Sequence, residues 1–261
     1  MIKVKRPAMP DILEVHHTEW AKTLVDLVTQ YGGYDKIPKN EKDQIVNKYQ
    51  HNDIKEAVEK MFHGKCVFCE EYVVAVSYIH IEHFHPKSIY YEETFEWDNL
   101  FPACCKCNIS KGDHDTKKEP IVNPEKDDPE KYFIYPLARI KSTPESPDIG
   151  KSQRTIQVCN LDRVILSRAM ATILLQFYEN EAALKDKVIE FEKLTQQAAK
   201  RRYLHDIHDA LENMKATSAD TESHAGFSRY ILRMSQVVVK TIQLINAHKN
   251  ELQLHSNFEL Y

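Results

Sequence analysis

Two pairs of cysteines constrain the fold of this chain more than any other feature of its sequence. Cys66 and Cys69 form one Cys-x-x-Cys pair, and Cys104 and Cys107 form a second. Two residues between thiolates allow both sulfur atoms to reach one tetrahedral ion from a tight turn. Four such ligands make a closed structural zinc site, so we expect Zn²⁺ to hold together a small module around these residues.

Two other interpretations of the cysteines stay open. Buried free cysteines behave as small hydrophobic residues, although two pairs at this spacing rarely arise by chance. A redox-active Cys-x-x-Cys would need only one pair. Cys105 is expected to point away from the ion, and the isolated Cys159 is expected to be an ordinary core residue.

The location of the protein is inferred from its first residues and from its cysteines. The segment MIKVKRPAMPDILEV is basic but has neither an apolar h-region nor a small-residue cleavage site. No run of apolar residues is long enough to cross a bilayer. We therefore expect a cytoplasmic location, where clustered cysteines indicate metal binding or catalysis rather than disulfides.

The interval between the two cysteine pairs contains polar residues in a specific order. It reads IEHFHPKS and then WDNLFPACCKCNISKG. The set resembles the HNH nuclease family. The matching elements are an acidic residue and a histidine before a proline, a central Asn-Leu, and Cys-x-x-Cys-Asn-x-x-Lys, which here are Glu82, His83, Asn99, Asn108 and Lys111. The resemblance implies a ββα-metal fold and the hydrolysis of phosphodiester bonds.

Chemistry suggests roles for three of these residues. Phosphodiester hydrolysis needs an activated water, a clamp on the phosphate and stabilisation of the leaving oxygen. His83 is the expected general base, because imidazole titrates near neutral pH. Its match to the family, rather than chemistry, selects it over His80, His85 and His114. Glu82 and Asn108 offer oxygen ligands that suit one catalytic Mg²⁺ or Mn²⁺ ion.

The remaining site residues depend more on the resemblance. It implies that Asn99 holds the loop that carries the base. Lys111 and Lys87 are expected to contact phosphates as point charges, and His85 is a candidate substrate contact. The chain has Glu82 where the family often has Asp or His, and Asn108 where it often has His. Both residues keep a ligand oxygen, which favours Mg²⁺ or Mn²⁺ over a soft transition metal.

The expected architecture is α+β but mostly helical, in four parts. They are an N-terminal helical segment (1–63), the HNH module with its zinc site (64–125), a loop-rich connector (126–154) and a C-terminal helical domain (155–261). Helical spacing of apolar residues predicts a first helix that stops at Gly32-Gly33 and a second from about Glu41 to Phe62. The stretch YVVAVSYIHIEHF predicts a short hairpin region. Near the C-terminus, spacing predicts one long helix through residues 231–245.

Three passages resemble the HNH subunit of Septu-type anti-phage systems (PtuB-like), which also occurs beside retron elements. They are IEHFHPKS, NPEKDDPEKYF and TIQVCNLDRVILSRA. This resemblance implies an ATPase partner of the SMC/ABC-like kind and a role in defence. The net charge of -4 is compatible with such a partner. A domain that binds duplex DNA by itself is usually basic, so an acidic chain needs either a local basic surface or a partner to bind nucleic acid.

The sequence therefore favours an endonuclease, with DNA as the expected substrate. Two alternatives stay open: a zinc-stabilised module that binds nucleic acid or protein without cutting, and an adaptor that regulates the ATPase. The coincidence of the five motif residues favours the enzyme, because a binding module needs no such set.

Overall fold

The computed structural model describes residues 1–73 and 78–260, which form two compact units. The first unit contains Met1–Ile134 and Ile140–Arg163, and the second contains Tyr135–Arg139 and Val164–Tyr261. This division differs from the four parts expected from the sequence. The helices before residue 63 belong to the same unit as the cysteine-rich module, and the second unit begins its main run at Val164 instead of residue 155.

The N-terminal part of the first unit is helical, as expected. Its helices are α1 (Asp11–Tyr31), α2 (Lys39–Val46) and α3 (Asn52–Met61). Helix α1 ends at Gly32, whose left-handed backbone (φ 69°) suits glycine, so this predicted end is confirmed.

The expected second helix is interrupted. A 3₁₀ turn covers Asn47–Gln50, and His51 is extended. The side chain of His51 accepts a hydrogen bond from the backbone N–H of Asp53 at 3.3 Å and so caps α3. Polar side chains of this kind compete for backbone hydrogen bonds, which ends a helix that apolar spacing alone would continue.

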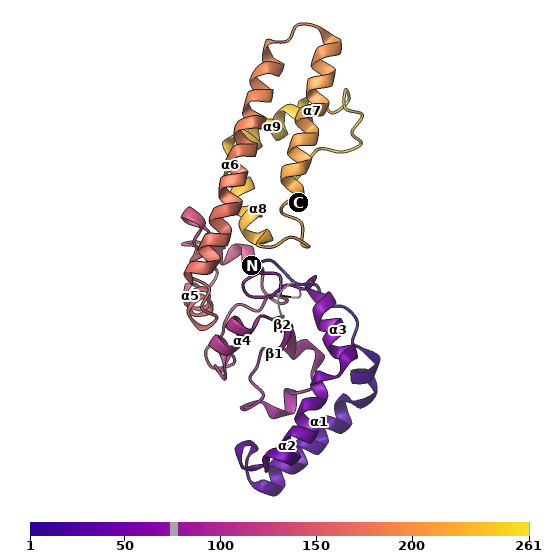
Figure 1. The fold of residues 1–261 in the computed structure, drawn as a ribbon, viewed down its shortest axis with the longest axis vertical. Helices are drawn as coiled ribbons and strands as arrows, with labels where there is room; N and C mark the ends of the chain where they lie inside the picture. Colours follow the sequence, from indigo (N-terminus) through magenta and orange to yellow (C-terminus); the bar gives the residue numbers. More distant parts are fainter. Residues whose placement is uncertain (74–77, 261) are drawn as a thin grey trace. The chain divides into compact units, whose positions relative to one another are not determined.

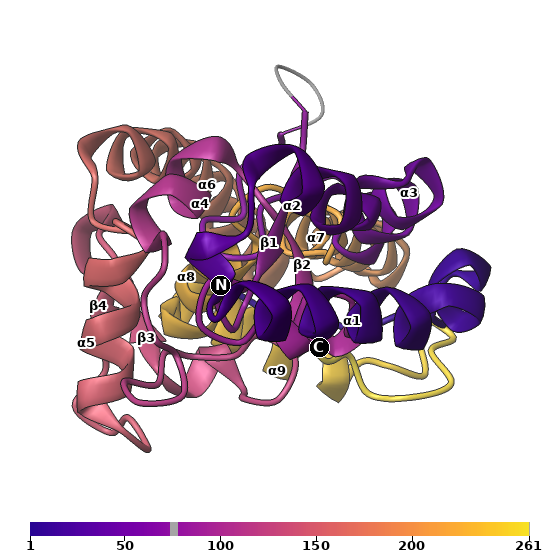
Figure 2. The same cartoon turned by 90° about the horizontal axis from the view of Figure 1, so that it is seen from below.

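A two-stranded antiparallel sheet and a following helix make up the ββα motif. Strand β1 (His80–His83) pairs with β2 (Leu100–Ala103), with Glu82 opposite Phe101, and α4 (Cys105–Lys111) follows directly. Helix α3 packs against β2, and Figures 1 and 2 both show it beside the strands. The ββα expectation is confirmed. Of the predicted hairpin region, residues 74–77 lie outside the described residues.

A compact aromatic core supports this small motif. Four buried aromatic residues fill it, namely Phe84, Phe95, Trp97 and Phe101. Burying an aromatic side chain removes a large apolar area from water.

The expected loop-rich connector contains two short strands, β3 (Phe133–Ile134) and β4 (Lys141–Ser142), and then helix α5 (Ile149–Val158). Helix α5 starts before residue 155 because the side chain of Asp148 caps it by accepting a hydrogen bond from the Lys151 N–H.

The second unit is a bundle of helices. Its helices are α6 (Val164–Lys193), α7 (Gln197–Ala216), α8 (Ala225–Met234) and α9 (Gln236–Ala247). Helices α6 and α7 form a long antiparallel pair (Figure 1), against which α9 packs. The single helix expected through residues 231–245 is split at Ser235, whose hydroxyl accepts from the Val238 N–H at 3.0 Å and starts a new helix.

Among residues 1–73 and 78–260, no helix is both long enough and apolar enough to cross a membrane.

Candidate functional site

The ββα motif brings three of the expected site residues to one cavity. Glu82 and His83 come from the end of β1, and Asn108 comes from the middle of α4. All three line a cavity of about 370 Å³ that Lys87 also lines. A carboxylate, an amide and an imidazole therefore converge on one space that solvent reaches, which is the arrangement a metal-dependent hydrolase needs.

The ring of His83 is held in one tautomer. Its Nε2 lies 3.0 Å from the backbone oxygen of Thr94. A carbonyl oxygen only accepts hydrogen bonds, so Nε2 carries the proton and Nδ1 keeps a free lone pair. Nδ1 is buried and has no hydrogen-bond partner among the described residues. Burial lowers the pKa of His83 to about 3, and Lys87 contributes to the shift, so the ring is neutral near pH 7.

Asn99 fixes the loop that follows His83. Its Oδ1 accepts from the backbone N–H of His85 at 2.7 Å, and its Nδ2 donates to the carbonyl oxygens of His85 and Glu93, both at 3.1 Å. The residue is buried. These three bonds connect both ends of the loop that contains the Thr94 carbonyl, so Asn99 indirectly orients the His83 ring.

Replacing Asn99 by alanine is expected to lower the free energy of unfolding by about 2 kcal/mol or more, because a buried N–H left without an acceptor costs about 1–3 kcal/mol. Chemical denaturation measures the loss, and hydrogen exchange should show faster exchange at the His85 amide. Asn40→Ala, at an exposed position on α2, is the matched control. Equal stability of the two variants would contradict this role.

Lys111 lies in the interior, which differs from the phosphate contact expected from the sequence. Its Nζ is 2.5 Å from a carboxylate oxygen of Glu82 and donates to the His83 carbonyl oxygen at 2.9 Å. Only 2% of the residue is exposed. Burial raises the pKa of Glu82, and Lys111 opposes that rise. The lysine thus favours the ionised form of Glu82 and holds the end of β1, and it is not among the residues that line the cavity.

Replacing Lys111 by methionine should lower the free energy of unfolding by about 3–5 kcal/mol, because it leaves a buried carboxylate without its partner. The double variant Lys111→Met/Glu82→Gln should recover much of that loss. Lys106→Met, at an exposed position of the same helix, is the control in the same denaturation experiment. If Lys111→Met proved as stable as Lys106→Met, the ion pair between Lys111 and Glu82 would not contribute to the stability of the fold.

Two basic residues near the cavity have different environments. Lys87 lines the cavity, and its Nζ lies 5.4 Å from the centre of the Tyr49 ring. Burial lowers the pKa of Lys87, against the opposing effect of Glu82. His85, the other candidate substrate contact, is not among the residues that line this cavity. Its Nδ1–H donates to the Thr116 hydroxyl at 2.7 Å, and that hydroxyl donates to the Phe84 carbonyl oxygen.

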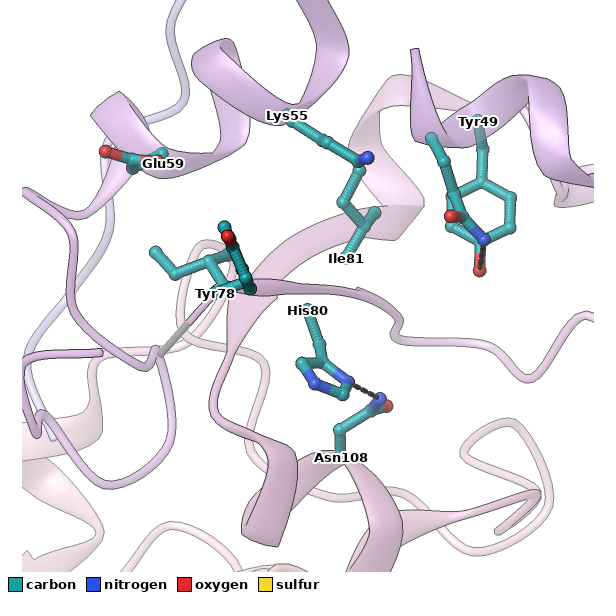
Figure 3. A pocket seen from close by; sticks show the side chains of 9 residues that line it. Tyr49, Lys55, Glu59, Tyr78, His80, Ile81 and Asn108 are labelled. Carbon is teal, nitrogen blue, oxygen red and sulfur yellow. Dashed lines mark hydrogen bonds between the residues drawn. The ribbon is translucent and has the colours of Figure 1, made fainter. Parts of the chain in front are cut away.

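Two further residues contact the expected site residues, although the sequence assigned neither of them a role. The rings of Tyr49 and His83 pack nearly perpendicular to each other, with ring centres 4.7 Å apart. Tyr49 comes from the N-terminal helical segment, and nothing in the motif predicts this contact. The Asn108 Nδ2 donates to His80 Nδ1 at 3.0 Å (Figure 3). Because His80 lies two residues before Glu82, the alternation of side chains along a strand could have indicated it.

The four paired cysteines form one cluster. The sulfur atoms of Cys66, Cys69, Cys104 and Cys107 all lie within 4.8 Å of one another. The Sγ atoms of Cys69 and Cys104 are 3.8 Å apart, which equals the edge of a tetrahedron with metal–sulfur bonds of about 2.3 Å. Burial raises the pKa of the Cys66 thiol, so four thiolates in this space need a cation. The donor set and its spacing fit a structural zinc ion.

The other two cysteines lie outside the cluster, and an arginine lies against it. Cys105 is partly exposed and Cys159 is buried. The guanidinium of Arg163 donates to Cys107 Sγ at 3.5 Å and approaches Cys104 Sγ at 4.0 Å. Burial by itself lowers the pKa of Arg163, but the thiolates of Cys107 and Cys69 raise it by more, so the net shift of the pKa is upward. The arginine therefore stays charged and offsets part of the negative charge of four thiolates.

Comparison with known proteins agrees with this geometry. Residues 66–114 match the HNH endonuclease family. The part of the chain that contains the cysteine cluster, the two strands and α4 is thus an HNH endonuclease domain.

Matches that extend beyond the HNH residues include two proteins named Septu protein PtuB. Septu protein PtuB of Bacillus thuringiensis is 40% identical over 124 residues, which are 45% of this chain and 45% of that protein. Septu protein PtuB of Bacillus mycoides (strain KBAB4) is 26% identical over 206 residues, 66% of this chain and 67% of that protein. The chain is therefore similar to PtuB, and the stronger match spans a little under half the length of that relative.

Proposed function

We propose that the protein is a metal-dependent endonuclease whose active site is the cavity between β1 and α4. One observation carries this proposal: His83, whose buried Nδ1 has no hydrogen-bond partner among the described residues, lines one cavity together with Glu82 and Asn108. A module that only binds nucleic acid or protein does not need a neutral imidazole whose tautomer is fixed by a backbone carbonyl, here that of Thr94.

The residues divide the work of hydrolysis between them. His83 Nδ1 takes a proton from the attacking water while Nε2–H stays bonded to the Thr94 carbonyl oxygen. A phosphate anion in the cavity raises the pKa of the histidine from its low value in the free protein, because a nearby negative charge favours the imidazolium. Tyr49 packs directly against the His83 ring, and Asn99 holds the loop that contains the Thr94 carbonyl.

Glu82 and Asn108 are the residues that would hold a divalent cation. Their oxygen atoms suit a hard ion, and the ion pair with Lys111 favours the ionised carboxylate. When bound, the ion supplies positive charge to the phosphate and to the leaving oxygen. Lys87 lines the same cavity without an ion-pair partner among the described residues, so we assign it the phosphate contact. His85 receives no substrate role in this scheme.

The biological setting follows from the similarity to PtuB. We propose that the protein cuts DNA as the nuclease subunit of a Septu-like defence complex in the cytoplasm, with an ATPase partner of the SMC/ABC-like kind. The net charge of -4 supports a partner that supplies part of the affinity for the substrate. A second candidate function is regulation of that ATPase without cutting.

The test is a cleavage assay on supercoiled plasmid and on RNA, with Mg²⁺ or Mn²⁺, with and without the proposed ATPase partner. The wild type should nick DNA only when a divalent cation is present. His83→Ala should bind the same partner but not cut. Protection against phage by the His83→Ala variant would instead support the regulatory function. Absence of cutting on both substrates in the complete complex would reject the nuclease.

A further inference from the structure

A histidine outside the motif lies beside the proposed site: His80 Nδ1 is 3.0 Å from Asn108 Nδ2. Resting on the proposed function, we propose that His80 is a third protein ligand of the catalytic cation, beside Glu82 and Asn108. Its imidazole nitrogen would make the site prefer a first-row transition ion to Mg²⁺.

Strand geometry places His80 beside the expected ligands. His80 and Glu82 are the first and third residues of β1, and alternate residues of a strand project from the same face. Asn108 reaches that face from α4 and lines two adjoining cavities. Glu82 lines the smaller cavity and His80 the larger, of about 610 Å³, and Asn108 is a lining residue of both. Figure 3 shows His80 and Asn108 pointing toward each other.

The separation of the two side chains fits chelation. His80 Nδ1 and Asn108 Nδ2 are 3.0 Å apart. Two donors in neighbouring positions of an octahedral ion with bonds of about 2.1 Å lie about 3.0 Å from each other. A half-turn of the amide exchanges its nitrogen and oxygen at nearly the same positions. The oxygen lone pair of Asn108 and the nitrogen lone pair of His80 would then both face a cation.

The environment of His80 differs from that of the proposed base. His83 is buried with Nε2 bonded to Thr94, whereas His80 is partly exposed and lines an open cavity. The Nδ1 atom of His80 accepts only the Asn108 amide in the described structure. It is therefore available to an ion that displaces this hydrogen bond.

An imidazole ligand changes which ion the site selects. Mg²⁺ prefers oxygen ligands and keeps several waters, whereas imidazole nitrogen suits first-row transition ions. Removing His80 should therefore weaken Mn²⁺ binding more than Mg²⁺ binding. Loss of a partner that only supports a ligand costs about 10–100-fold in affinity, so loss of a direct ligand should raise the Kd for Mn²⁺ by at least about tenfold.

The test uses the full-length, zinc-loaded protein carrying His83→Ala, with Mn²⁺ as the probe. Electron spin echo spectroscopy detects ¹⁴N from an imidazole bound directly to Mn²⁺, and the free Mn²⁺ signal gives the Kd. The parent should show one bound imidazole. His80→Ala in the same background should lose the nitrogen signal and bind Mn²⁺ more weakly. His80→Asp should regain affinity without the nitrogen signal. His205→Ala, exposed on α7, should behave like the parent.

The outcomes separate this inference from the proposed function. A nitrogen signal that persists in His80→Ala, or is absent from a parent that binds Mn²⁺, would overturn the inference, and His80 would then only orient the Asn108 amide. If the wild type cuts DNA in that case, the proposed function still stands. If the wild type neither cuts nor binds Mn²⁺, both fail.

Discussion

Replacing His83 by alanine is expected to slow phosphodiester cleavage by about 10²–10⁴-fold, the usual contribution of a positioned general base. Among the described residues that line the cavity beside Glu82, it is the one with an imidazole, and its Nδ1 has a free lone pair. The substitution leaves in place the proposed phosphate contact from Lys87 and the proposed oxygen ligands. The loss should therefore fall on kcat, while KM changes little.

The buried position of His83 calls for a second variant. Alanine leaves a cavity beside Tyr49 and removes the bond to the Thr94 carbonyl, so some stability will be lost. His83→Gln keeps most of the volume and a donor for Thr94 but is a very poor base. It should stay folded and be as inactive as His83→Ala. Single-turnover cleavage of plasmid, together with thermal unfolding, checks both variants. Cleavage at the wild-type rate by either would reject His83 as the base.

Replacing Cys66 by serine is expected to unfold the HNH domain outright. Cys66 is fully buried, and its sulfur is one of four within 4.8 Å of one another. Structural zinc supplies about 10–16 kcal/mol in zinc-finger peptides, while whole domains are stable by only about 5–15 kcal/mol. Loss of one thiolate removes enough of the zinc term to exceed what this small sheet and helix can supply alone.

The matched control for Cys66→Ser is Cys105→Ser. Cys105 lies next to Cys104 in sequence but outside the cluster, so this variant should keep zinc, fold and activity. Zinc content by mass spectrometry and limited proteolysis between residues 64 and 125 distinguish the two variants. A protease-resistant, zinc-free Cys66→Ser protein would show that the cluster is not a structural metal site.

The order of short motifs predicted the core of this protein well. The two Cys-x-x-Cys pairs predicted the sulfur cluster, because a tight turn alone brings two thiols to one ion. The run from Glu82 to Lys111 predicted two strands and a helix, because strand pairing and the helix that follows are local in sequence. The family resemblance implied that Asn99 holds the loop that carries the base, and Asn99 makes three hydrogen bonds to His85 and Glu93.

Apolar spacing was less reliable where a polar residue could end a helix. It predicted one helix from about Glu41 to Phe62, but His51 caps a new helix within that range. It also predicted one helix through residues 231–245, but Ser235 starts another. The spacing of apolar residues shows only which face of a helix is buried. The same spacing can continue across a short break between two helices, so it does not reveal the break. A side chain that bonds to the backbone decides whether the helix itself continues.

By itself the sequence determined which chemical groups are available: four paired thiols suited to one ion, a carboxylate and an amide proposed to hold another, and an imidazole next to that carboxylate in the chain. Only the tertiary structure decided which groups are free to act. It buries Lys111 against Glu82, sets the tautomer of His83 through Thr94, and places Tyr49 on that ring. Hydrogen bonding and burial depend on residues far apart in the chain, and a motif records only what its own spacing can bring together.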